Sequence, residues 1–333
     1  MIQRHISMNT YIFDKFTPNY LGNDNVLLDY EVVLRDISEK RYKNIVFNFT
    51  EEDKYYHFEE FQDAIINLDK LEEYIEKNDV NVYVLHTTNE EYTYKNNIFP
   101  IRTKFIKWPV TDLHFTDGMI RNNDIRNFTP QHIKKLYTCV NGTDKNHRMY
   151  LVTRLLQKYL GQNGYLSLCT TKTPHQKNPS IYLPSEIEMN GDYYGSIRNI
   201  NSIHKEFYHS LIEVITETQT ESNCFTEKTW LPILLGKPFI IYGAKNIHQT
   251  LVDMGFLSYD EIWREDLDIE SSTKERGEII TEILYDLRNT NYQKLYKKLF
   301  PKLIHNQKRA REIIRKNEYF PSEINFVEKE QLF

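Results

Sequence analysis

The sequence predicts an α/β protein built from two Rossmann-like domains. Short apolar stretches rich in β-branched and aromatic residues alternate with segments of helical period in both halves of the chain, as in parallel sheets covered by helices. The length of 333 residues also exceeds that of a usual single core, so two domains are expected. We place the first domain at residues 1–130 and the second at residues 131–300, followed by a helical segment at residues 301–333.

The composition is typical of a soluble globular protein, with 40% hydrophobic and 27% charged residues. The formal net charge of −5 gives no overall attraction to nucleic acid or to anionic membranes. Cys139, Cys169 and Cys224 are scattered, and because Cys139 and Cys169 lie in apolar strand-like runs we expect buried free thiols in a reducing compartment. No continuous apolar segment is typical of a signal peptide or a transmembrane helix, and we therefore expect a cytoplasmic location.

In the first half of the chain, three apolar stretches read as strands and one long segment reads as a helix. Phe61, Ile65 and Leu68 begin the helical period of that segment. This order favours an open parallel sheet, in which ligands lie outside the carboxyl ends of the strands. The predicted strands are residues 43–49, 80–86 and 105–110, and the predicted helix is residues 58–77.

The second half repeats the alternation of strand, polar loop and helix. Gly161 and Gly236 mark the ends of its two helices, because glycine commonly follows a helix C-terminus. The predicted strands are residues 135–140, 165–169, 211–215 and 239–242, and the predicted helices are residues 147–160 and 226–235.

The start of the helix at residues 226–235 is a candidate anion site. Thr226 can cap this helix, with Glu227 and Lys228 in its first turn. A helix N-terminus and a lysine together suit a diphosphate, and a glutamate beside them can accept hydrogen bonds from the hydroxyls of a ribose. The alternative interpretation is a surface helix with a threonine cap and a solvated lysine.

Arg148 occupies a similar position in the first turn of the helix at residues 147–160. Its planar guanidinium can contact two phosphate oxygens at once, which suits a diphosphate leaving group. An exposed surface arginine is the alternative. For the neighbouring His147 we expect a structural or capping role.

Glu217 lies ten residues before Glu227, and Thr226-Glu227-Lys228 is followed by an apolar strand that ends in Tyr242-Gly243. This pattern resembles the C-terminal donor-site signature of bacterial alpha-1,3-fucosyltransferases. The resemblance covers roughly residues 135–260.

The resemblance also includes an asparagine, a short polar loop and an arginine, which correspond to Asn141 and Arg148. The sequence departs from the family pattern in two places. Thr218 replaces an asparagine, and Glu221-Ser222 replaces a Gly-Tyr pair. These departures leave open whether the nucleotide carries guanine or uracil, and which sugar it carries.

The resemblance implies two facing Rossmann-like domains, the GT-B arrangement, with residues 301–333 returning to the first domain. It implies an inverting, metal-independent glycosyltransferase that uses a GDP- or UDP-linked sugar as donor and needs no further cofactor. Arg148 and Lys228 would contact the diphosphate, and Glu227 the ribose. Glu217 would lie near the sugar or the leaving group, and Asn141 would also belong to the donor site.

The family uses an acidic residue after a similar first strand as the general base, and Glu51 matches it best by position. Glu52 and Asp53 follow directly. A solvated acidic loop is the alternative interpretation of this cluster. Asp112 and Asp117 compete for the same role, because they follow the strand at residues 105–110.

The acceptor stays open between a glycan, a lipid-linked glycan and, if the chain comes from a phage or virus, a modified DNA base. Residues 294–316 contain nine Lys or Arg and one acidic residue, Glu312, and we expect two helices broken at Pro301. This stretch suits contact with an anionic surface, or a solvated helix face. A non-catalytic nucleotide- or glycan-binding protein of the same fold is the alternative function.

We expect no metal site. Asp266 and Asp268 form an Asp-x-Asp pair, which in another glycosyltransferase architecture holds a divalent ion, but the pair lies far from a strand end. No cluster of histidine and cysteine indicates zinc.

Overall fold

The computed structural model describes residues 5–7, 10–13, 28–29, 34–35, 37–38, 42–49, 65–66, 68–86, 103–107, 109–141, 145–168, 203, 205–221 and 223–319. The chain divides into two compact units. The first unit comprises residues 1–111 and 319–333, and the second comprises residues 112–318.

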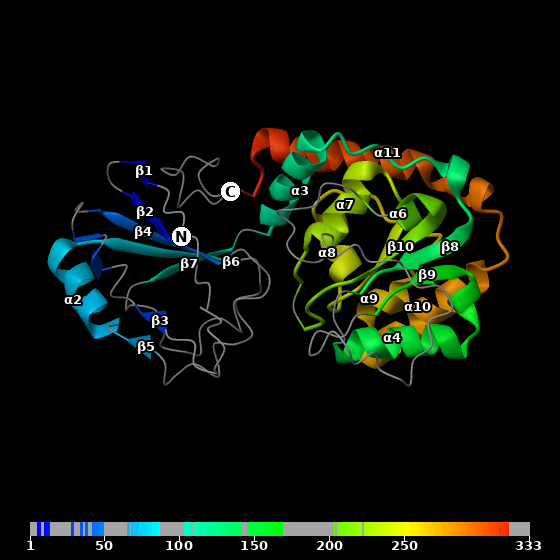
Figure 1. The fold of residues 1–333 in the computed structure, drawn as a ribbon, viewed down its shortest axis with the longest axis horizontal. Helices are drawn as coiled ribbons and strands as arrows, with labels where there is room; N and C mark the ends of the chain where they lie inside the picture. Colours follow the sequence, from blue (N-terminus) through cyan, green and yellow to red (C-terminus); the bar gives the residue numbers. More distant parts are fainter. Residues whose placement is uncertain are drawn as a thin grey trace. The chain divides into compact units, whose positions relative to one another are not determined.

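The first unit contains a five-stranded sheet of order β1-β2-β4-β6-β7 (Figure 1). Strands β2, β4, β6 and β7 are parallel, whereas β1 is antiparallel to β2. Helix α2, Leu68–Asn78, buries Leu71 and Ile75. The strands are β1 His5–Ser7, β2 Thr10–Phe13, β4 Asn44–Phe49, β6 Asn81–His86 and β7 Lys104–Lys107, so the three predicted strands of this half are confirmed.

The predicted helix at residues 58–77 is confirmed from residue 68 onwards and is wrong at residues 65–66. Residues 65–66 form a short strand, β5 (Ile65–Ile66), which pairs in parallel with β3 (Leu28–Asp29). Two consecutive β-branched isoleucines favour an extended backbone, and the pairing with β3 decides their conformation against the helical period. Residues 58–64 lie outside the described part of the chain.

The second unit is built on a four-stranded parallel sheet of order β11-β10-β8-β9. Helices α7 and α11 pack together on one side of these strands, and α4 and α10 pack together on the other (Figure 1). This α/β architecture is compatible with a Rossmann-like fold. The elements are β8 Lys135–Cys139, α4 Asn146–Gln157, β9 Gly164–Leu166, β10 Ser210–Thr216, α7 Glu227–Leu235, β11 Phe239–Tyr242, α10 Thr273–Leu287 and α11 Tyr292–Lys316.

Shorter elements complete the second unit. They are α3 Thr111–Asn122, which begins at its boundary, and then η4 Pro130–His132, η5 Leu160–Gln162, α6 Lys205–His209, α8 Ile247–Asp253 and α9 Glu265–Ile269.

The apolar runs of the sequence become the core of the second unit. All four residues of β11 are buried, because helices cover both faces of the sheet. Helix α7 is buried from Thr229 to Leu235, as expected for a helix that packs between a sheet and another helix. Gly236 ends α7 with a left-handed backbone (φ 72°), as the sequence predicted.

The second unit begins earlier than the predicted boundary at residue 131, because the segment before β8 is fastened to it. The Phe128 N–H donates to the Leu235 carbonyl at 2.8 Å, and the Phe128 ring packs against Phe207 and Tyr296. These contacts draw residues 112–130 into the second unit.

The predicted break at Pro301 is also wrong, since α11 is a single helix of 25 residues with Pro301 inside it. Pro301 is exposed, the buried Leu299 and Leu303 lie on either side of it, and the helix as a whole packs against α7. Residues 301–318 belong to the second unit, and the predicted return of the segment 301–333 to the first domain stays a prediction. Residues 320–333 lie outside the described part of the chain.

Candidate functional site

Three strand ends of the second unit meet at one edge of its sheet. Because β8, β10 and β11 are parallel, their carboxyl ends lie together. β8 leads to α4, β10 leads to α7, and β11 leads to α8. In α/β proteins, ligands bind outside this edge of the sheet.

Glu217, the first residue after β10, fixes the start of α7. Its side chain is fully buried and accepts three hydrogen bonds: from the Thr226 N–H (3.2 Å), the Thr226 hydroxyl (2.7 Å) and the Thr229 hydroxyl (2.6 Å). Thr226 Oγ1 in turn accepts from the Lys228 N–H at 3.3 Å, which confirms the predicted cap. Burial raises the pKa of Glu217, while the Lys228 charge and both threonine hydroxyls oppose that rise.

Glu227 and Lys228 stand at the start of this fixed helix. Lys228 Nζ lies 3.1 Å from Glu227 Oε1, and the lysine side chain is 31% exposed. The Glu227 side chain is 15% exposed, and its Oε2 atom is buried with no hydrogen-bond donor among the described residues. A buried carboxylate oxygen without a donor is unfavourable, so a ligand hydroxyl would stabilise it.

The first turn of α4 is fastened to the residues that follow β10. Arg148, only 4% exposed, donates from Nη2 to the Thr216 carbonyl at 3.2 Å. Lys145 Nζ donates to the Thr218 carbonyl at 3.3 Å. Lys145, Arg148 and, through α7, Lys228 are therefore all anchored around the carboxyl end of β10.

His147 makes a structural contact at the same place, as the sequence led us to expect. Its Nε2 lies 2.9 Å from the Glu217 carbonyl, and because a carbonyl only accepts, Nε2 carries the proton. The ring also packs edge-on against Tyr242. Burial lowers the pKa of His147 to about 4, with the hydrogen bond to Glu217 opposing and the charges of Arg148 and Lys145 adding to the effect.

Asn141 joins the ends of three strands. Its Nδ2 donates to the Ser167 carbonyl at 3.0 Å, and its Oδ1 accepts from the Thr216 hydroxyl at 2.6 Å. Its own N–H donates to Ser167 Oγ at 3.0 Å. With 1% of its surface exposed, Asn141 has a structural role in this geometry, and its predicted donor-site role stays a prediction.

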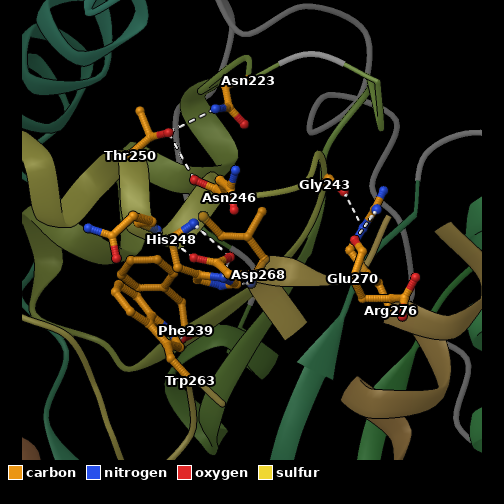
Figure 2. Close-up of polar contacts among 12 residues, drawn as sticks. Asn223, Phe239, Gly243, Asn246, His248, Thr250, Trp263, Asp268, Glu270 and Arg276 are labelled. Carbon is orange, nitrogen blue, oxygen red and sulfur yellow. Dashed lines mark hydrogen bonds and ion pairs between the residues drawn. The ribbon is translucent and has the colours of Figure 1, made fainter. Parts of the chain in front are cut away.

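The end of β11 differs from the ends of β8 and β10, because the helix that follows it, α8, already has a carboxylate of this chain at its start (Figure 2). Asp268 accepts hydrogen bonds from the N–H groups of His248 (3.1 Å) and Gln249 (2.6 Å), and from His248 Nδ1 at 2.8 Å. Burial would raise the pKa of Asp268, but these hydrogen bonds and His248 lower it. The other ring nitrogen of His248 accepts from the Ile241 N–H at 3.0 Å.

Both carboxylates of the Asp-x-Asp pair are thus engaged by other residues of the second unit. Asp268 caps α8, and Asp266 pairs with Arg264, whose Nε lies 3.0 Å from Asp266 Oδ1. In the described part of the chain, no group of three or more His, Cys, Asp or Glu side chains is arranged to hold a metal ion.

Sequence reasoning missed Arg276, although this residue is 2% exposed and joins two segments at this edge of the sheet. It donates to the Gly243 carbonyl after β11 (3.1 Å) and to the Thr220 carbonyl after β10 (3.1 Å), and Figure 2 shows it beside Gly243. Nothing in the local sequence marks it, because its burial depends on segments far apart in the chain. Thr229 was also missed, although a threonine three residues after a helix cap was a detectable signal.

The predicted general base cannot be placed, because Glu51, Glu52 and Asp53 lie outside the described residues. Of the competing candidates, Asp117 forms an ion pair of 2.7 Å with Arg121 one helical turn later. Asp112 lies in the first turn of α3. The choice of base therefore stays a prediction.

Two further sequence expectations concern cysteines and membrane spans. Cys139 and Cys224 are buried free thiols, as expected, and burial raises the pKa of Cys139 to about 12. Cys169 lies outside the described residues. None of the described helices combines the length and apolarity that crossing a membrane requires.

Comparisons with known proteins do not assign the chain to a family. No protein-family model matches the chain, and no curated protein is similar to it at the significance threshold that we applied.

Proposed function

We propose that the protein is an inverting, metal-independent glycosyltransferase that takes its sugar from a nucleotide diphosphate sugar. The observation that carries the proposal is the buried Glu217, which holds Thr226 and Thr229 and thereby sets Glu227 and Lys228 at the carboxyl edge of the sheet. The start of α4, with its basic residues, is anchored to the same strand end.

Lys228 is the residue that would contact the diphosphate. It is partly exposed and lies at a helix N-terminus, where the backbone dipoles also favour an anion. Arg148 is buried just behind this edge, so its charge would raise the local positive potential. Glu227 would accept a hydrogen bond at Oε2 from a ribose hydroxyl.

In the proposed reaction, an acceptor hydroxyl attacks the anomeric carbon of the sugar while a carboxylate, for which Glu51 is the sequence candidate, takes its proton. The new carbon–oxygen bond forms as the bond from the anomeric carbon to the phosphate oxygen breaks. The departing diphosphate gains negative charge, which Lys228 and Arg148 would stabilise.

The test is a panel of GDP- and UDP-linked sugars, with release of the nucleoside diphosphate measured with and without glycan or DNA acceptors. We expect turnover of at least one donor, and we expect Lys228→Ala to lower that turnover by about 100-fold or more. Unchanged turnover in a folded Lys228→Ala variant would remove Lys228 from the mechanism. Binding of a nucleotide without any turnover would favour the non-catalytic alternative.

A further inference from the structure

Helix α11 carries its basic residues on two different faces. Its buried residues include Leu295, Leu299 and Leu303, and the helix packs against α7, where Gln307 donates to the Leu234 carbonyl at 2.6 Å. Five of its exposed basic residues follow one another at spacings of 3, 11, 3 and 4 residues, which places them on one side of the helix, opposite the buried face. We call these five the outward stripe: Lys294, Lys297, Lys308, Arg311 and Arg315.

The remaining four basic residues of α11 lie on one flank and pair with carboxylates. Lys302 contacts Asp260 at 2.8 Å, and Arg309 contacts Glu318 at 2.5 Å. Lys298 lies 3.3 Å from Glu261, and Lys316 pairs with Glu312. The described carboxylates that pair with basic residues of α11 thus lie on this flank. The outward stripe concentrates five positive charges on a protein whose formal net charge is −5.

A neighbouring segment carries further basic residues. Gln307 of α11 donates to Asn127 Oδ1 at 3.1 Å, and Gln293 donates to the Pro130 carbonyl, so residues 125–134 lie along α11. This segment adds two exposed basic residues, Arg126 and Lys134.

The length and rigidity of the stripe fit an extended polyanion. From Lys294 to Arg315 the helix rises by about 32 Å, at 1.5 Å per residue. Duplex DNA carries about one negative charge per 1.7 Å of its axis, so a straight row of cations of this length meets many phosphates. Because α11 is held by its buried face, these charges are fixed on one rigid element.

A lipid surface fits this face less well. Helices that bind a membrane interface point an apolar face towards the acyl chains, but the apolar face of α11 is packed against α7. In α11, all of which the structure describes, Phe300 is the one large apolar side chain that is exposed, at 46%, and a single such side chain does not form an apolar face.

We propose that the outward stripe of α11 binds the phosphate backbone of duplex nucleic acid without reading its sequence. Lysine and arginine contacts to phosphates fix position and affinity but carry no base information. The proposal is independent of the nucleotide site, because none of its residues belongs to that site.

The test measures binding of a short fluorescent DNA duplex to the full chain by anisotropy, over a salt series from about 50 to 200 mM. One variant carries Lys294→Gln, Lys297→Gln and Lys308→Gln. The matched control carries Lys298→Gln, Lys302→Gln and Lys316→Gln on the paired flank, so both variants lose the same net charge. Melting temperatures verify that both are folded.

For five phosphate contacts we expect log K to fall with log salt at a slope of about −4.5. The outward variant should reduce that slope by about 2.7 and weaken binding about tenfold or more, whereas the paired-flank control should stay close to wild type. Equal weakening by both variants, or no binding by wild type at low salt, would overturn the proposal. Binding to phosphatidylserine vesicles but not to DNA would overturn it in favour of a lipid surface.

Discussion

Lys228 and Lys237 stand at opposite ends of α7, and therefore at opposite ends of the sheet that α7 covers. Lys237 is fully buried, and its ammonium donates to Glu213 Oε2 (2.6 Å), the Phe207 carbonyl (2.7 Å) and Ser210 Oγ (2.9 Å). Lys228 is 31% exposed and lies beside Glu227. The same residue type is thus fully buried among three acceptors at the amino end of the strands and partly exposed at their carboxyl end.

The difference distinguishes a structural charge from one that can meet a ligand. The three donors of an ammonium group are fully used at Lys237, so a ligand has nothing to add there. Burial lowers the pKa of Lys237, and Glu213 opposes that effect. At the carboxyl edge, by contrast, Glu227 keeps a buried oxygen to which no described donor reaches.

The largest expected effect is the loss of stability when Lys237, at the amino end of the strands, is replaced. Lys237→Met should lower the free energy of unfolding by about 3–5 kcal/mol, because it leaves the largely buried Glu213 carboxylate without its cation. Urea unfolding at pH 7 measures this change. The matched variant Lys228→Met should lower stability by less, because Lys228 is 31% exposed whereas Lys237 is fully buried.

The double variant Lys237→Met/Glu213→Leu sharpens this contrast. Since apolar residues often replace a buried ion pair without loss, most of the lost stability should return. Equal losses for Lys237→Met and Lys228→Met would contradict the distinction between the two ends.

The next effect is acid sensitivity at the carboxyl edge. The pKa of His147 falls from 6.5 to about 4 on folding, so between these values the unfolded chain binds a proton that the folded chain does not. The contribution of the neutral His147 to the free energy of unfolding is therefore fully present above pH 6.5. It is lost as the pH falls towards 4, which lowers the free energy of unfolding by up to about 3 kcal/mol. Urea midpoints at pH 7 and pH 4.5 measure the loss.

His147→Asn keeps a side-chain donor near the Glu217 carbonyl but removes the titrating group. We expect this variant to lose less stability than wild type between those two pH values. If both lose the same amount, His147 does not titrate as its burial indicates.

A smaller effect is expected at the cap of α7. Thr226→Val removes the hydroxyl that accepts from Lys228 N–H and donates to Glu217, and should lower the free energy of unfolding by about 2 kcal/mol. Thr281→Val is the control, because within the described part of the chain its buried hydroxyl donates to the carbonyl one turn earlier in α10 and joins no wider network. A cap variant no more destabilised than this control in urea unfolding would contradict the role of the Glu217 network.

Local signals in the sequence were sufficient for most of the second unit. The apolar runs of β8, β10 and β11 are buried on both faces, and Gly236 ends α7 where the sequence predicted. Thr226 also caps α7 as predicted, because capping depends on neighbouring residues alone.

Features that depend on distant segments were missed. Pro301 reads as a helix break, but tertiary packing of α11 overrides it. Ile65 fits a helical period, yet pairing with β3 makes it a strand. The burial of Arg276 and Lys237 follows from carbonyl groups contributed by other segments, which no local pattern contains.

Calorimetric titration of GDP and UDP into wild type, Lys228→Met and Lys245→Met at pH 7 tests the central claim most directly. Lys245 is the exposed lysine before α8, whose start is already occupied by Asp268. We predict that wild type and Lys245→Met bind at least one of the two nucleotides alike, and that Lys228→Met binds it about tenfold or more weakly. Equal affinity in all three proteins, or no binding to wild type, would contradict a diphosphate site at the start of α7.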